Sequence, residues 1–276
     1  MRRILLVIVA ALTLSSCQNE SLNLMSFNVR YNGVWEDDGE NAWQYRREAV
    51  AAMILEEMPD AVGMQEVLPD QMAYLDSALG SQYRRIGVGR DDGDTVGESM
   101  CIYYKYNRLQ LIGWHTYWLS ETPDSVSYGW DAACRRTVTV GTFEDAHTGK
   151  SFTYMNTHLD HVGREARKNS VKQLCALADG CEGPVVIGGD MNSGIDDSIF
   201  LPLKYRKLLS ARDIASVTDT AYTFNGFGKS SLSRIDHFFV RGWEVEEFKT
   251  LNGDYGVPYV SDHYPIVVKL RVERGN

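Results

Sequence analysis

Apolar and polar residues alternate at the start of the chain in a pattern that predicts two successive pairs of a strand and a helix. The expected elements are a strand over 22–28, a helix over 43–58, a strand over 61–66 and a helix over 69–79. Asn41 is the expected N-cap of the first helix, and Pro59 follows its end. The first quarter of the chain therefore has a βαβα order.

The rest of the chain is richer in strands. Turn residues such as those at 105–107 and 147–149 separate short apolar runs. The expected strands cover 83–88, 100–104, 109–119, 136–143, 151–159, 184–188, 235–240 and 264–270, with a helix over 164–178. Helices at two separated places, with many strands between them, predict a sheet packed on a sheet with helices outside.

The N-terminus has the pattern of a sorting signal. A charged start is followed by an apolar run over 4–14, which is too short to span a bilayer as a mature helix. The string LSSC, ending at Cys17, resembles a bacterial lipoprotein cleavage box, which predicts that Cys17 is the first mature residue and carries lipid. The alternative is an ordinary secretory signal in which Cys17 is incidental. We expect a signal peptide over 1–16, a lipidated tether over 17–21 and one domain over 22–276, anchored in the cell envelope outside the cytoplasm.

Composition and charge narrow the class of substrate. A hydrophobic content of 44% is ordinary for a globular enzyme. The formal net charge of −9 becomes −11 once Arg2 and Arg3 leave with the signal. Such a chain lacks the broad positive surface that dominates binding to long nucleic acids. A nuclease is not excluded, because bound metal ions and a local basic patch could compensate, but smaller substrates are favoured.

Four cysteines follow Cys17, and none has the spacing of a zinc site. Cys101 and Cys134 sit in apolar runs and are expected to be buried free thiols. Cys175 and Cys181 could close a short disulfide loop outside the cytoplasm. Four cysteines in so long a chain do not make a disulfide scaffold.

Six short motifs place polar side chains at the ends or starts of expected strands. They are SFNVRY with Asn28, MQEV with Glu66, NTHLDH with His158, GDMN with Asp190 and Asn192, SRIDHF with Asp236, and SDHYP with Asp262 and His263. Carboxylate and amide oxygens suit a hard divalent cation, and imidazoles suit proton transfer or contact with phosphate. The combination predicts hydrolysis of a phosphate ester. The chain has neither a G-x-S-x-G elbow nor a G-x-x-x-x-G-K loop, which argues against a serine acyl transferase and a nucleotide-driven phosphotransferase.

The direction of the strands constrains the fold. Four of the motif residues follow their strands, namely Asn28, Glu66, His158 and Asp190, whereas Asp236, Asp262 and His263 come near strand starts. A doubly wound parallel sheet gathers its site at the C-terminal ends of strands only. If all seven residues form one site, strands of both directions must meet at one rim, as in a mixed or antiparallel sandwich.

The six motifs, in this order and over nearly the whole mature chain, resemble the endonuclease/exonuclease/phosphatase superfamily. The resemblance implies a four-layer α/β/β/α sandwich of two mixed, mostly antiparallel sheets with helices outside. It also implies a divalent cation, Mg²⁺ with Mn²⁺ or Ca²⁺ as alternatives. By this resemblance Glu66 is a metal ligand, Asn28 supports the metal or orients a phosphate oxygen, and Asp262 contributes to the metal region.

The catalytic set that the resemblance implies consists of His158, Asp190, Asn192, Asp236 and His263. Asp190 polarises or deprotonates the attacking water, and Asn192 holds a phosphoryl oxygen. His263 binds or protonates the phosphate, or acts as a base, and Asp236 holds its ring in the working tautomer. Adjacent residues of a strand point to opposite sides, so His237 is expected to be a bystander.

Other residues beside the motifs are weaker candidates for substrate binding. In the family His158 contacts the phosphate, and Asn156 and Asp160 share its parity in NTHLDH. These two either support His158 or cap the helix near residue 164, and both alternatives stay open.

Arg136 is a candidate for a second phosphate or carboxylate contact. Trp130 and Phe224 are candidates for the wall of a substrate pocket, although aromatic residues at such spacing are more often core. We treat the acidic stretch 91–98 as a turn, because it lacks the regular spacing of a calcium loop.

The leading hypothesis is a lipid-anchored, metal-dependent phosphodiesterase or phosphatase that acts as a monomer on a small or lipid-linked phosphate ester. A metal-dependent nuclease of the same family is the second hypothesis. The third is a noncatalytic lipoprotein that binds ligands at the surface. The expected partners are the phosphorylated small molecule or lipid head group and the membrane.

Overall fold

The computed structural model describes residues 20–33 and 38–273. The expected signal peptide over 1–16 and the lipid attachment at Cys17 lie outside these described residues. Within the two ranges, no helix is both long enough and apolar enough to span a bilayer.

The first of two sheets has the motif-bearing strand β1 at its centre. β1 runs parallel to β2 and antiparallel to β13, so the C-terminal ends of β1 and β2 lie beside the start of β13. The strand order is β10-β12-β13-β1-β2-β4-β3. The strands are β1 Leu22–Asn28, β2 Ala61–Gln65, β3 Tyr83–Ile86, β4 Ile102–Lys105, β10 Val217–Thr218, β12 Trp243–Thr250 and β13 Ile266–Val272.

The second sheet repeats this arrangement with different strands. β7 and β8 are parallel, and β11 runs antiparallel to β8, so that Asp236 at the start of β11 pairs with Asp190 at the end of β8. The strand order is β5-β6-β7-β8-β11-β9. The strands are β5 Leu109–Trp118, β6 Thr137–Asp145, β7 Ser151–His158, β8 Val185–Asp190, β9 Leu209–Ser210 and β11 Asp236–Arg241.

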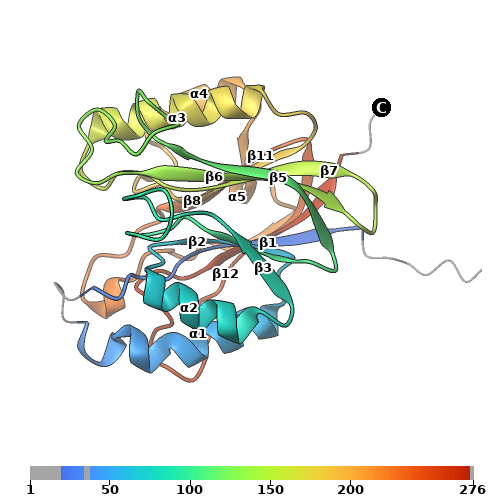
Figure 1. Ribbon diagram of the computed structural model, residues 1–276. Coiled ribbons are helices and arrows are strands. Elements are labelled where there is room, and N and C mark those ends of the chain that lie inside the picture. The colour runs from blue at the N-terminus through green and yellow to red at the C-terminus, as the bar shows by residue number, and fades with distance from the viewer. Residues whose placement is uncertain (1–19, 34–37, 274–276) are drawn as a thin grey trace, which may run out of the picture.

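Helices cover the outer face of each sheet (Figure 1). They are α1 Trp43–Glu57 and α2 Pro69–Leu79 on the first sheet, and α3 Arg164–Asp179 with the short α4 Leu201–Tyr205 on the second, while the short α5 Ala211–Ile214 contacts β9 and β11. On β1, Leu24 packs in a cluster with residues of the second sheet, and its neighbour Met25 packs in a cluster with α1 and α2. A third cluster joins the second sheet to α3 and α4. Three cores between four layers confirm the expected α/β/β/α sandwich.

Polar side chains of β7 cross the core and tie the two sheets together. Asn156 donates to the carbonyls of Met64, at 2.7 Å, and Cys101, at 2.8 Å, on the first sheet. Tyr154 donates to a carbonyl of β1 at 2.9 Å. Gly63 makes room for both, because a Cβ atom there would lie 2.4 Å from the Tyr154 hydroxyl. These bonds fix one sheet against the other beneath the strand ends.

One local expectation is wrong, and one strand was missed. The N-cap of α1 is Ala42, and Asn41 instead ends a short 3₁₀ turn, where its carbonyl accepts a hydrogen bond from Arg46. Strand β12 was not expected at all. Its register with β13 shifts between Val245 and Glu247, and this bulge breaks the alternation by which a strand is recognised in sequence.

The cysteines are free thiols throughout the described residues. Cys175 is buried in the core under α3, and the half-buried Cys181 donates to the carbonyl of Leu177, so the short disulfide loop is not formed. Cys101 is buried as expected, whereas Cys134 is half-buried in the loop before β6.

Candidate active site

The C-terminal ends of β1, β2 and β8 meet where the two sheets adjoin. The side-chain amide of Asn28 donates to Glu66 Oε1 at 2.9 Å and to Asp190 Oδ2 at 3.0 Å. Glu66 follows a strand of the first sheet, and Asp190 ends a strand of the second. One amide therefore bridges two carboxylates that are 124 positions apart in the sequence.

Glu66 is held as an ionised carboxylate. Burial by itself raises the pKa of Glu66, but the hydrogen bonds from the Asn28 amide and from the Tyr31 N–H, the latter at 3.0 Å, outweigh it and lower the pKa. Asn28 uses its own Oδ1 to accept from the N–H of Arg30 at 2.9 Å. Asn28 thus donates from its amide nitrogen to both carboxylates and holds them in position, while its amide oxygen accepts from the Arg30 N–H instead.

His263 lies between two aspartates on the side of the second sheet. Its Nδ1 is 2.9 Å from Asp236 Oδ2, and its Nε2 is 3.6 Å from Asp190 Oδ2. Burial lowers the pKa of His263, but the charges of Asp236 and Asp190 outweigh it and raise the pKa well above the ordinary value. His237, the neighbour of Asp236, points the other way and contacts the carbonyl of Ser193 at 2.8 Å.

His158 and Asn192 form a second pair over Asp190. The amide Nδ2 of Asn192 lies 3.0 Å from His158 Nε2, which is in turn 3.4 Å from Asp190 Oδ2. Burial, together with the charges of Arg136 and Arg90, lowers the pKa of His158 well below its ordinary value, so this ring is neutral. Its Nδ1 is buried without a hydrogen-bond partner among the residues that the structure describes.

Burial has the opposite effect on Asp190. It raises the pKa of this carboxyl to about 7, against the lowering effect of His263 and of the hydrogen bonds from Asn192 and Asn28. A bound cation would favour the ionised form. A cation bound beside Asp190, in addition to the protonated His263, would therefore hold this group as a carboxylate at neutral pH.

Backbone strain is concentrated at this end of the sandwich. Of the described non-glycine residues with positive φ, four lie at strand ends or in loops around the cluster: Arg30, Glu66, Asn192 and Phe227. Each such conformation costs of order 1–3 kcal/mol and persists where the surrounding structure enforces it, which is typical of functional sites.

A buried arginine of α1 supports the loops that carry the cluster. Arg46 is 1% exposed and donates to the carbonyls of Val29 and Arg30 after β1, and to that of Val260 before the SDHYP motif. Burial lowers the pKa of Arg46 to about 10, so it is a cation at neutral pH. Arg46 was not among the expected functional residues, although a charge three residues after Trp43 and four before Val50 lies on the apolar face of the helix.

Asp262 is placed beside the cluster but is engaged elsewhere. Its Oδ2 lies 3.9 Å from Arg30 Nη1, and its Oδ1 accepts from the Ser261 hydroxyl at 3.2 Å. Two groups of the cluster, among the described residues, have donor atoms that converge closely enough for one cation: Glu66 with His158 and Asp190, and Asp190 with Asp236 and His263. Asp262 is in neither group.

The weaker candidates divide into structural and exposed residues. Asn156 is 0% exposed and its side chain is hydrogen-bonded between the sheets, so the structure places it away from any surface that a substrate could contact. Asp160 accepts from four backbone N–H groups, including those of Val162 and Gly163 just before α3, and pairs with Arg136 at 3.3 Å. Asp160 thus orders the turn into α3, and its charge is neutralised by the ion pair with Arg136.

Cys134, in the loop before β6, forms a third convergent group with Asp160 and His161, which follow β7. Arg136 contacts both Asp160 and the Nδ1 of His161, at 2.9 Å. An arginine already neutralises this group, so it does not fit a cation.

Of the two aromatic candidates, Phe224 touches the cluster. Its ring lies 5.0 Å from that of His263 in an edge-on arrangement, and it is half-buried. Trp130 is half-buried in the connection between β5 and β6, and no hydrogen bond or ring contact within the described residues joins it to the cluster. Phe224 is therefore the better candidate for a substrate contact.

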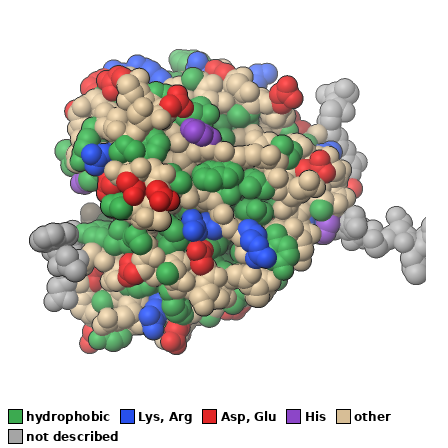
Figure 2. Space-filling model, in the orientation of Figure 1, with side chains coloured by type: hydrophobic (Ala, Val, Ile, Leu, Met, Phe, Trp, Pro, Cys, Tyr) green, Lys and Arg blue, Asp and Glu red, His purple; other side chains and the backbone are tan. Residues whose placement is uncertain are grey.

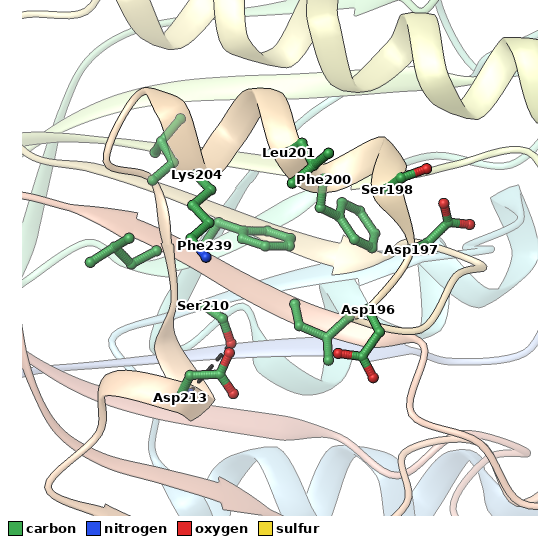
Figure 3. Close-up of a pocket in the computed structure, with 12 residues that line it drawn as sticks. Asp196, Asp197, Ser198, Phe200, Leu201, Lys204, Ser210, Asp213 and Phe239 are labelled. Carbon is green, nitrogen blue, oxygen red and sulfur yellow. Dashed lines mark hydrogen bonds between the residues drawn. The ribbon is translucent and has the colours of Figure 1, made fainter.

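A cavity of about 590 Å³ lies elsewhere, on the outer flank of the second sheet beside α4 (Figure 3). Phe200 and Phe239 form its apolar wall, and Asp196, Asp197 and Asp213 surround it. It shares no residue with the cluster at the strand ends. Its volume therefore says nothing about the chemistry there.

Comparison with known proteins identifies the family. The Endonuclease/Exonuclease/phosphatase family matches residues 25–263, and a prokaryotic membrane lipoprotein lipid attachment site matches residues 1–18. The structure of a family member from Bacteroides vulgatus is 35% identical, covering 92% of this chain and 99% of that one, with a TM-score of 0.86. A mannosyl-6-phosphatase of Bacteroides thetaiotaomicron is 30% identical, covering 90% and 99%, with a TM-score of 0.84. An uncharacterised protein of Acanthamoeba polyphaga mimivirus is 25% identical over 88% of this chain and 95% of its own length. The chain belongs to the endonuclease/exonuclease/phosphatase family.

Proposed function

We propose that this protein hydrolyses a phosphate ester with a divalent cation held at Glu66 and Asp190. The observation that carries the proposal is the Asn28 amide, which joins these two carboxylates at 2.9 and 3.0 Å, with His158 and His263 within 3.6 Å of Asp190. The oxygen donors fit Mg²⁺, with Mn²⁺ or Ca²⁺ as alternatives. When bound, such a cation lowers the energy of charge developing on the phosphoryl and leaving oxygens.

Two side chains have complementary proton roles in this proposal. Asp190, as a carboxylate, orients the attacking water and accepts its proton. His263 is protonated, since its pKa is raised, and donates a hydrogen bond to a phosphoryl oxygen while Asp236 holds Nδ1. The neutral His158 and the Asn192 amide add uncharged contacts on the other side of Asp190.

The substrate class follows from similarity and from charge. A relative at 30% identity is named a mannosyl-6-phosphatase, which favours a sugar phosphate monoester as the first substrate to test. A nuclease is less favoured, since the net charge is −9 and basic and acidic side chains are interspersed on the face shown in Figure 2. Phe224, edge-on to His263, is placed to pack against the leaving group.

The test uses the soluble form that begins at Gln18. Hexose 6-phosphates, an aryl phosphate monoester, an aryl phosphodiester and a plasmid are each assayed with Mg²⁺ and with excess chelator. Turnover that disappears with chelator supports the proposal, and turnover that ignores the chelator removes the cation from it. Binding of phosphate esters without turnover under any condition would instead favour a noncatalytic binding protein.

Single substitutions test whether the cluster is the site of hydrolysis. We expect His263→Gln and Asp190→Asn to lower kcat/KM by about 10²–10⁴-fold. His115→Gln is the control, because His115 is exposed on β5, away from the cluster. Equal activity of the wild type and His263→Gln would contradict the assignment.

We also propose that the mature protein carries lipid on Cys17 and acts outside the cytoplasm. The match of residues 1–18 to a lipoprotein attachment site supports this. Replacement of Cys17 by serine should release the protein from the membrane fraction, and mass spectrometry of the wild-type N-terminal peptide should show the lipid.

A further inference from the structure

Strand β1 connects the anchor end of the domain directly to the candidate active site. Ser21 immediately precedes β1, and Asn28, which bridges the two carboxylates, is its last residue. An extended strand rises about 3.3 Å per residue, so Ser21 and Asn28 are about 23 Å apart. The chain enters at one end of the sandwich, and the cluster lies at the other (Figure 1).

Ser21 is fixed on the anchor end. It is 6% exposed, its hydroxyl donates to Glu246 at 3.0 Å, and its carbonyl accepts from Arg108 at 3.3 Å. Arg108 in turn pairs with Asp145, at the turn between β6 and β7, at 2.8 Å. The following residue, Leu22, is in register with Leu270 of β13. The tether therefore ends at Ser21, because a tether that reached further along the chain would require β1 to separate from its sheet.

The tether is shorter than the domain. Four peptide units separate Cys17 from Ser21, and even fully extended they span at most about 14 Å. For the strand ends that carry Asn28 to face the bilayer, Ser21 would have to stand about 23 Å or more above the surface. The tether cannot reach that far.

We propose that the active site faces away from the membrane that anchors the protein, and that its substrate is a soluble phosphate ester rather than a lipid head group of that membrane. This inference rests on the proposed function and on lipid attachment at Cys17. It separates two sources of the same chemistry, a phosphate ester free in solution and one held at the bilayer surface. The anchor then retains the enzyme in the envelope without bringing it to its substrate.

The first test measures orientation and does not depend on activity. The half-buried thiols are removed by Cys134→Ser and Cys181→Ser, and a fluorophore is attached at Lys150→Cys or at Lys229→Cys in the lipidated protein on vesicles. Lys150 is exposed on the β6–β7 turn near Ser21, and Lys229 is exposed in the loop that follows Phe224. Energy transfer to an acceptor on the lipid head groups should be severalfold stronger from position 150. Equal transfer from both positions, or stronger transfer from position 229, would overturn the proposal.

The second test measures access to substrate. A soluble aryl phosphate ester and the same ester on a lipid head group in the vesicle are assayed with the lipidated protein and with the form that begins at Gln18. We expect equal rates on the soluble ester and no gain from the anchor on the vesicle-borne ester. A higher rate of the anchored form on its own vesicles would overturn the proposal.

A third variant separates tether length from substrate recognition. A flexible insert of about 20 Gly and Ser residues between Glu20 and Ser21 gives a tether whose average reach is about 25 Å and whose extended length is far greater. If the vesicle-borne ester is chemically accepted, this insert should raise its turnover severalfold and leave the soluble ester unchanged. Failure of all forms on the soluble ester would refute the proposed function, while the energy-transfer result would still decide the orientation.

Discussion

Replacing Arg46 with methionine should lower the stability of the fold and disturb the geometry of the candidate active site. The guanidinium donates to four backbone carbonyls, those of Val29 at 2.5 Å, Arg30 at 2.8 Å, Asn41 at 2.8 Å and Val260 at 2.9 Å. Two of these carbonyls follow the bridging strand β1, and another precedes the SDHYP motif. Methionine fills a similar volume and offers no donor.

The magnitude follows from the number of carbonyls left without a donor. A buried acceptor that loses its partner costs about 1–3 kcal/mol. Water can reach the Asn41 and Arg30 carbonyls more easily, because their hydrogen bonds to Arg46 are only partly buried. We expect Arg46→Met to lower the free energy of unfolding by about 3–5 kcal/mol. Arg46→Lys should lose roughly half as much, since an ammonium keeps the charge but lacks the fork that reaches separated acceptors.

The assay compares unfolding in urea with turnover at a temperature where every variant is folded. Under those conditions Arg46→Lys should still lower kcat, because the backbone after Asn28 is no longer held. Arg47→Met is the matched control, since Arg47 is the next residue of the same helix, is exposed and lies 4.8 Å over the Tyr74 ring. A folded Arg46→Lys with unchanged kcat, or an equal loss of stability in Arg47→Met, would refute this reasoning.

Three further outcomes are expected. Glu66→Gln should weaken Mg²⁺ binding at least about tenfold by calorimetry, with activity partly restored at high Mg²⁺, because the carboxylate is the proposed ligand; unchanged affinity would contradict this. Burial raises the pKa of Glu98 to about 7 despite Arg90 at 2.8 Å, so the folded state retains a proton that the unfolded state releases. With chelator present, stability should therefore fall by up to about 3 kcal/mol as the pH rises from about 4.5 to 7, and Glu98→Gln should flatten this part of the curve in urea titrations. Phe224→Ala should raise KM for an aryl ester more than it lowers kcat, and an unchanged KM would exclude the contact.

The sequence predicted the architecture because most of its strands are short apolar runs bounded by turn residues. Expected and observed bounds agree closely for β1, β2, α2 and α3. Strands of both directions meet at one rim, as their polar ends predicted, since Asp236 starts a strand that runs antiparallel to the one ending at Asp190. Strand β12 was missed because its bulge between Val245 and Glu247 changes which residues face the core. A pattern of period two cannot follow such a shift without knowledge of the partner strand.

Residue roles were harder to predict than residue positions. Asn156 and His158 share one side of β7, so parity treats them alike. His158 is at the strand end and reaches Asp190, whereas Asn156, one repeat earlier, lies between the sheets. The position of each residue along β7 decides whether it lies at the rim or between the sheets, and that boundary depends on where the other sheet packs. Arg46 was overlooked for a related reason, since its acceptors come from loops far away in sequence.

The split of the two bridged carboxylates between the sheets has a mechanical consequence. Glu66 moves with one layer and Asp190 with the other, so a sliding displacement of the layers would change the gap that the proposed cation would fill. The hydrogen bonds that Asn156 and Tyr154 make from one sheet to the other resist that displacement just beneath the gap. With a cation held there as proposed, the resistance of the two sheets to sliding would set how sharply ionic radius is discriminated, and weakening these hydrogen bonds should broaden the range of cations that support turnover.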